Sequence, residues 1–199
     1  MSSGTQSHRL TLLLFRIIAM SVSSSTSAYI GLGSNLGQSR TLLKKAWRSL
    51  AQHPEVSLKA LSSPYRTRPV GMESSHWFIN AVGLLRTTLP AEALLDLLLE
   101  TEQQFGRVRH PELEGYQDRT LDLDLLLFAN SIIQSEQLIL PHPAMHERLF
   151  VLIPFAEIAA HTDHPVLKKT VAELLIEEQN RKGGRKGIKQ IRWQEEETD

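Results

Sequence analysis

The sequence predicts an α+β fold of the ferredoxin-like type, in which helices cover one face of a mainly antiparallel sheet. Strand-like and helix-like stretches alternate along the central part of the chain in the order β-α-β-β-α-β. The chain has 199 residues, 41% of them hydrophobic, so it can bury one sizeable core. We expect a single domain over residues 28–180, a disordered or wrongly assigned extension over 1–27, and a flexible tail that packs little over 181–199.

The first half of this domain begins with a buried strand. The apolar run at 28–32 is followed by the turn formers of 33–35, so we expect a strand that leads into a loop there. Residues 38–52 carry apolar side chains at helical spacing opposite basic ones, which predicts a helix with one buried face. Residues 56–65 predict a second strand. The stretch 66–76, with prolines, a glycine and paired serines, predicts a long loop.

The second half supplies the remaining strands and helices. Pro90 can occupy the first turn of a leucine-rich helix that stops near Gly106. A polar, glycine-containing loop follows at 107–118. The other predicted elements are a strand at 78–87, a strand of alternating leucine and aspartate at 120–128, its hairpin partner at 131–140, and a helix at 171–178.

Charge and composition limit the possible partners. The 22 Lys and Arg balance 22 Asp and Glu, which argues against a general binder of nucleic acid or anionic membranes. The absence of cysteine excludes disulfides, thiolate metal sites and thiol nucleophiles. The apolar run at 10–20 is short for a membrane span and contains Arg16. We expect a cytoplasmic monomer whose partners are small molecules.

The strongest chemical signal is the segment RTLDLD at 119–124. Residues two apart on a strand point to the same face, so burying the alternating leucines brings Asp122 and Asp124 together on the other face. Paired carboxylates suit Mg²⁺, which completes its octahedron with water and substrate phosphates. The alternative is a solvent-facing edge strand with solubilising aspartates.

Arginines precede these aspartates. Arg107, Arg109 and Arg119 bracket the loop just before the strand. Guanidinium groups match phosphate oxygens in bidentate geometry, so carboxylates, metal and arginines together indicate a polyphosphate ligand. For Arg109 in particular, a surface ion pair with a nearby acidic residue is an equally good interpretation.

Two further patterns are weaker. The turn containing Gly31 and Gly33 lacks the spacing and lysine of a phosphate-binding loop, so its glycines can simply allow close backbone approach. His142 and His146 have a metal-ligand spacing, but Pro143 between them argues against a shared helical face. A loop histidine that donates to a phosphate or packs on a base fits better.

Six motifs occur in order along the chain: 28–35 (AYIGLGSN), 65–67 (YRT), 78–81 (FINA), 106–109 (GRVR), 119–124 (RTLDLD) and 141–148 (PHPAMHER). Together they resemble the 6-hydroxymethyl-7,8-dihydropterin pyrophosphokinase family of folate biosynthesis, over about residues 28–178. The resemblance implies the same α+β fold, ATP as co-substrate and two Mg²⁺ ions. It also implies transfer of the β,γ-pyrophosphate of ATP to the hydroxymethyl oxygen of the pterin, leaving AMP.

The resemblance assigns roles by position. It makes Asp122 and Asp124 the metal ligands, and Arg107 and Arg119 catalytic residues that hold the transferring phosphates. The residues implied to contact the pterin are Thr67, Val70, Phe78, Asn80 and Phe150. The residues implied to contact the nucleotide are Glu102, Arg109, Tyr116, Leu125, His142 and Arg148.

The chain departs from the family pattern in its loops. Tyr116 is followed by Gln117 and Asp118 where Gly-Pro is common, and Arg68 stands where a proline is frequent. These changes concern contacts made by the loops rather than the reaction. Two other functions remain as alternatives: a Mg-dependent nucleotidyltransferase, although Ser34 lies far in sequence from the aspartates, and a non-catalytic ferredoxin-like module, although no aromatic RNA-binding signature is present.

Overall fold

The computed structural model describes residues 25–69, 74–108, 117–184 and 187–193. Within these ranges the strands are β1 (Thr26–Ser34), β2 (Val56–Leu61), β3 (Tyr65–Thr67), β4 (Phe78–Thr87), β5 (Asp122–Phe128), β6 (Ile133–Gln134), β7 (Ile139–Leu140) and β8 (Ile188–Gln190). The helices are α2 (Ser39–Ser49), α3 (Ala91–Gln104), α4 (Leu149–Ala159) and α5 (Val171–Lys182), with short 3-10 turns η1 (Leu50–Gln52) and η2 (Met145–Glu147).

The main sheet has the strand order β5-β1-β4-β3-β8, and β2 also pairs with β4. All of these pairs are antiparallel. The order confirms the predicted ferredoxin-like α+β fold, with one difference in detail. The strand expected over 56–65 is divided into β2 and β3, which pair with successive parts of β4, so that Thr67 reaches the same end of the sheet as Phe78.

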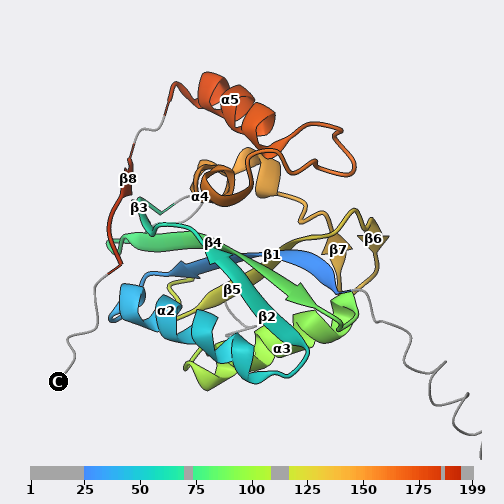
Figure 1. Ribbon diagram of the computed structural model, residues 1–199. Helices are drawn as coiled ribbons and strands as arrows, with labels where there is room; N and C mark the ends of the chain where they lie inside the picture. Colours follow the sequence, from blue (N-terminus) through green and yellow to red (C-terminus); the bar gives the residue numbers. More distant parts are fainter. Residues whose placement is uncertain (1–24, 70–73, 109–116, 185–186, 194–199) are drawn as a thin grey trace, which may run out of the picture.

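Two hydrophobic clusters hold helices to the sheet, one on each face (Figure 1). Leu43 of α2 and Leu98 of α3 pack with the β5 side chains Leu123 and Leu125 in the first cluster. The predicted alternation along β5 is therefore confirmed. Because the leucines face α2 and α3, the intervening aspartates face the opposite side of the sheet.

The opposite face of the sheet is covered by α4, and α5 packs on the outer side of α4 (Figure 1). The helix α4 was not among the predicted elements. Leu152 and Phe155 of α4 are fully buried in the second cluster. The segment is apolar except for Glu157 and contains Pro154, so it shows no clear helical periodicity. The last predicted helix is longer than expected; it starts at a capping box formed by Thr170 and Glu173 and ends at the left-handed Gly183.

Two further expectations are corrected. Residues 131–140 do not extend the main sheet as a partner of β5, because β6 and β7 pair with each other. Residues 187–193 are not a tail that packs little. β8 pairs with β3, and the indole N–H of Trp193 donates to the Ser62 carbonyl at 2.9 Å. In the part of the chain described, no helix is long and apolar enough to cross a membrane.

Candidate active site

A cavity of about 460 Å³ lies between the sheet and the helices α4 and α5, on the face to which the aspartates point. Its floor comes from β1, β4 and β5, and its walls come from η2, the start of α4 and the end of α5. The predicted site residues that line it are Thr67, Phe78, Asn80, Arg119, Asp122, Asp124, Arg148 and Phe150. The fold therefore brings together residues that are far apart in sequence.

Glycines lie beside both aspartates. In the antiparallel register Gly33 pairs with Asp122, and Gly31 pairs with Asp124. A Cβ atom at Gly33 would lie 3.7 Å from the Cβ of Asp122, and one at Gly31 would lie 3.6 Å from that of Asp124. The glycines thus keep the floor of the cavity free of side chains next to the carboxylates. This agrees with the simpler interpretation of the Gly-x-Gly turn as a place of close approach.

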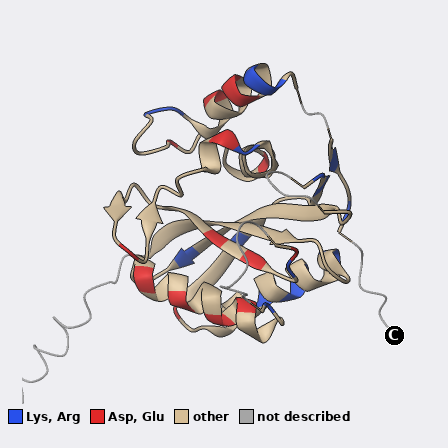
Figure 2. Ribbon diagram, turned by 180° about the vertical axis from the view of Figure 1, so that it is seen from behind, with Lys and Arg blue, Asp and Glu red and all other residues tan. Residues whose placement is uncertain are grey.

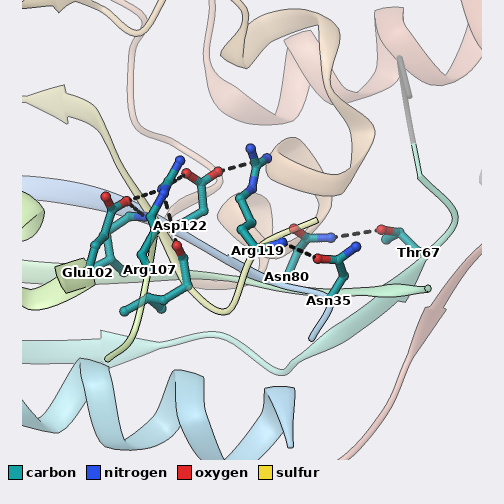
Figure 3. Close-up of polar contacts among 9 residues, drawn as sticks. Asn35, Thr67, Asn80, Glu102, Arg107, Arg119 and Asp122 are labelled. Carbon is teal, nitrogen blue, oxygen red and sulfur yellow. Dashed lines mark hydrogen bonds and ion pairs between the residues drawn. The ribbon is translucent and has the colours of Figure 1, made fainter. Parts of the chain in front are cut away.

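The Asp122 carboxylate lies between two arginines (Figure 3). Arg107 Nη1 donates to Asp122 Oδ1, and Arg119 Nη2 lies 3.0 Å from Asp122 Oδ2. Arg107 Nη1 also lies 2.5 Å from Oε1 of Glu102, which is only 2% exposed. The same Glu102 oxygen accepts the backbone N–H of Leu123 at 2.7 Å. Glu102 therefore fixes both Arg107 and the start of β5.

The neighbouring Asp124 has an unusual proton affinity. Burial, together with the adjacent Asp122 carboxylate, raises the pKa of Asp124 to about 7, although Arg148 and Arg119 act in the opposite direction. β5 is an edge strand, as the solubilising-aspartate alternative supposed. However, its aspartates line a cavity next to arginines, so that alternative does not describe them.

The other end of the cavity is built from an amide and aromatic rings. Asn80 Nδ2 donates to Thr67 Oγ1 at 2.8 Å, and both side chains are buried (Figure 3). Phe78 and Phe150 line the same cavity, and the guanidinium carbon of Arg119 lies 5.7 Å from the centre of the Phe78 ring. This end offers ring faces and a fixed carboxamide, which suit a flat heterocycle that carries both donors and acceptors.

The donor set fits Mg²⁺ bound together with a phosphorylated substrate. Asp122 and Asp124 present carboxylate oxygens, which are hard donors, to the cavity from one strand face. Among the described residues, no group of three or more Asp, Glu, His or Cys side chains could hold a metal ion. A site with carboxylates alone from the protein is typical of Mg²⁺, which takes its other ligands from water and substrate phosphates.

A family model described as 7,8-dihydro-6-hydroxymethylpterin-pyrophosphokinase (HPPK) matches residues 29–160. The chain belongs to the HPPK family. The resemblance inferred from the motifs is therefore confirmed.

Curated relatives carry the corresponding name. A 2-amino-4-hydroxy-6-hydroxymethyldihydropteridine pyrophosphokinase of Bacillus subtilis is 45% identical over 136 residues, covering 68% of this chain and 80% of the relative. A protein of the same name from Methylorubrum extorquens is 39% identical over 150 residues, covering 75% of this chain and 92% of the relative.

Solved structures support the fold. A crystal structure of Plasmodium falciparum HPPK-DHPS has a TM-score of 0.67 at 13% identity and covers 84% of this chain. A second structure of that protein, described as A437G with SDX-DHP, also has a TM-score of 0.67 at 13% identity and covers 88% of this chain. This chain spans 47% and 50% of the length of those chains, and the likeness concerns the HPPK fold alone.

Some predicted HPPK site residues lie elsewhere. Val70, Arg109 and Tyr116 are outside the described residues. The side chain of Leu125 is 4% exposed in the core under the sheet, so it does not line the cavity, in contrast to its expected nucleotide contact. His142 lies beside the cavity rather than in its lining, and burial, reinforced by Arg148, lowers its pKa to about 4. His142 is therefore neutral at neutral pH.

Other residues that shape this HPPK site were not predicted from the sequence. Asn35 is 5% exposed; its side chain accepts the backbone N–H of Arg119 at 2.8 Å and donates to Asp118 at 2.5 Å. Its place at the end of the first predicted strand was a usable signal. Arg181 and Lys182 also line the cavity, but they fall in the segment expected to be a tail.

Proposed function

We propose that this cavity is where the HPPK reaction takes place. The enzyme is an ATP-dependent pyrophosphokinase of folate biosynthesis. It transfers the pyrophosphoryl group of ATP to 6-hydroxymethyl-7,8-dihydropterin and gives AMP and the pterin diphosphate. The observation that carries the proposed location is the Asp122–Asp124 face, which shares one cavity with the amide and aromatic end.

We assign the phosphate end of the cavity to ATP. Asp122 and Asp124 would hold two Mg²⁺ ions. When bound, these ions supply charge neutralisation on the phosphate oxygens. Arg119 and Arg107 now pair with the Asp122 carboxylate, and their guanidinium groups would bind the oxygens of the transferring phosphates. Glu102 would keep Arg107 in position, since it holds that guanidinium from the buried side.

We assign the other end to the pterin. Phe78 and Phe150 would hold the ring, and Asn80 would pair with its amide-like edge. Thr67 orients the Asn80 carboxamide through their hydrogen bond. Val70, Arg109 and Tyr116 remain proposed contacts by family position. For Leu125, a contact with the nucleotide would have to come from its backbone.

The proposed step is a direct displacement. The hydroxymethyl oxygen forms a bond to the β-phosphorus of ATP and gives up its proton to water, the bond between that phosphorus and the oxygen bridging to the α-phosphate breaks, and AMP leaves. The chain contributes mainly positioning and electrostatic stabilisation, and no covalent enzyme intermediate is required. Neutral His142 and the cationic Arg148 beside it would hold the nucleotide without adding negative charge.

The family match decides between this function and the alternatives. A nucleotidyltransferase releases pyrophosphate, whereas HPPK releases AMP. A non-catalytic module releases neither. We further propose that the enzyme acts as a monomer in a reducing cytoplasm. The described lining residues of a single chain already include the two aspartates, Arg119 and the aromatic rings, and the sequence contains no cysteine.

The test is product analysis with purified protein. AMP is expected only when 6-hydroxymethyl-7,8-dihydropterin, ATP and Mg²⁺ are all present, and it should appear in equal amount to the pterin diphosphate. Removal of Mg²⁺ with EDTA should stop the reaction. Release of pyrophosphate without AMP would contradict the assignment.

A further inference from the structure

The end of α5 contributes charge to the active-site cavity from outside the matched family segment. The HPPK family model ends at residue 160, but Arg181 and Lys182 line the cavity. Figure 2 shows a basic (blue) stretch at the C-terminal end of α5, after acidic (red) ones, and Arg181 and Lys182 belong to this last turn. Their charge faces the same space as the proposed phosphate site.

A buried carboxylate holds both cations in place. Glu178 is 4% exposed; it accepts Arg181 Nε at 2.7 Å and Arg181 Nη2 at 3.0 Å. Lys182 Nζ lies 2.9 Å from Glu178 and also donates to the backbone carbonyl of Glu147 at 2.9 Å. One carboxylate therefore partners two cations, so the group formed by Glu178, Arg181 and Lys182 carries one net positive charge.

The cations remain accessible to an incoming ligand. The side chain of Arg181 is 58% exposed and that of Lys182 is 41% exposed. Among the described residues that line the cavity, the charged ones are Arg68, Arg119, Arg148, Arg181 and Lys182 against Asp122, Asp124 and Glu147. Once metal ions bind the two aspartates, Glu147 is the remaining acidic group of that lining.

Helix capping alone is the competing explanation, because basic residues in a last turn interact favourably with the helix dipole. Capping, however, does not depend on which way the side chains face. Glu177 of the same helix forms a second ion pair at 2.7 Å with Lys169, which lies just before the helix, and neither residue lines the cavity. That pair provides a matched reference for the effect of charge on this helix.

We propose that Arg181 and Lys182 form a cationic rim that draws the triphosphate of ATP into the cavity. The inference rests on the proposed function, which places ATP in this cavity. Positive charges within about 10 Å of the entrance to a binding cavity increase the association rate of a polyanionic ligand at low ionic strength. Added salt weakens this effect. Changes in rim charge typically alter association rate and salt dependence.

The experiment measures the association rate of a fluorescent, non-hydrolysable ATP analogue with Mg²⁺ by stopped flow at low ionic strength. The double variant Arg181→Gln/Lys182→Gln is expected to bind about 3- to 10-fold more slowly than the wild type. Glu147→Gln, which removes an exposed negative charge from the same cavity, should bind faster. Lys169→Gln should equal the wild type.

Three results would contradict the proposal. The first is an association rate of the double variant equal to that of the wild type at low salt, and the second is a reduction of that rate that is equally large in 0.5 M salt. The third is slower association by Glu147→Gln. Association of the uncharged pterin is the internal control and should not change in any variant. If the double variant does not fold, Glu147→Gln decides the matter, since a rate no faster than the wild type rejects the proposal. Absence of AMP formation by the wild-type enzyme would instead reject the proposed function.

Discussion

The carboxamide oxygen of Asn35 accepts the backbone N–H of Arg119 at 2.8 Å, and the Asn35 backbone N–H donates to the Arg119 carbonyl at 3.1 Å. The loop after β1 is thereby joined to the segment that enters β5 (Figure 3). Since Arg119 also pairs with Asp122, the position of the proposed phosphate-binding arginine depends on Asn35.

Replacement of Asn35 should therefore affect catalysis more than folding. In Asn35→Ala the Arg119 backbone N–H loses its side-chain acceptor, while the backbone bond from Asn35 N–H to the Arg119 carbonyl remains. Displacement of a positioning group by about 1 Å can cost about 100-fold in rate. We expect a loss of that order in kcat, measured by AMP formation, in a protein with the circular dichroism spectrum of the wild type. Asn130→Ala, in the exposed turn after β5, should retain full activity. Equal activity of the two variants would show that the anchor has no catalytic role.

Asp124 should make the metal-free protein less stable at higher pH. Its folded-state pKa of about 7 lies above the ordinary 3.8, so the stability that it contributes is fully present below about pH 3.8 and is lost as the pH rises through 7. In Asp124→Asn this loss is removed. The variant should gain free energy of unfolding over the wild type as the pH is raised, by roughly 1–4 kcal/mol at pH 8.

Urea unfolding in EDTA at pH 5 and pH 8 measures this difference. The gain of Asp124→Asn over the wild type is expected to be larger at pH 8, although the variant should be inactive. A difference that is the same at both pH values would mean that the Asp124 carboxyl is not held with a raised pKa.

Glu102 and Lys169 belong to ion pairs in very different surroundings. Glu102 is 2% exposed and pairs with Arg107, whereas the Lys169 side chain is 45% exposed. Glu102→Gln leaves a buried guanidinium with less compensation, so we expect a loss of about 1–3 kcal/mol in unfolding free energy. Lys169→Gln should cost at most about 0.5 kcal/mol. Equal losses in urea unfolding would contradict the structural role given to Glu102.

Gly83 makes room for a tryptophan. A Cβ at Gly83 would lie 2.4 Å from the Cη2 atom of Trp47, so Gly83→Ala must displace this α2 ring from the sheet. Overpacking of this kind costs about 1–3 kcal/mol. In a Trp47→Leu background the same substitution should cost less, because the obstructing ring is gone. A cost that is equal in both backgrounds, measured by urea unfolding, would place the strain elsewhere.

The sequence alone predicted the structure correctly where a local residue pattern and the tertiary packing favour the same arrangement. The alternation along β5 predicted correctly that Asp122 and Asp124 share a face, because strand periodicity and burial of the leucines impose the same arrangement. The order of strands and helices likewise predicted the sheet. Leu125, two positions beyond Leu123 in that alternation, follows the leucine face rather than the cavity.

Other parts depended on packing that has no local signature. Apart from Glu157, α4 is apolar because it lies between the sheet and α5, so its sequence lacks the polar face that would indicate a helix. β8 is a three-residue strand that exists through pairing with β3. The contributions of Asn35 and of the α5 cations arise from contacts between distant segments, which residue spacing alone does not predict.

Metal binding by the β5 aspartates can be tested by direct titration. The number of Mn²⁺ ions bound to the protein with a non-hydrolysable ATP analogue can be measured by electron paramagnetic resonance, for the wild type and for Asp122→Ala and Asp124→Ala. We expect two ions on the wild type, and fewer ions with no AMP formation on each folded variant. Wild-type metal binding and near-normal pyrophosphoryl transfer by either variant would contradict this expectation.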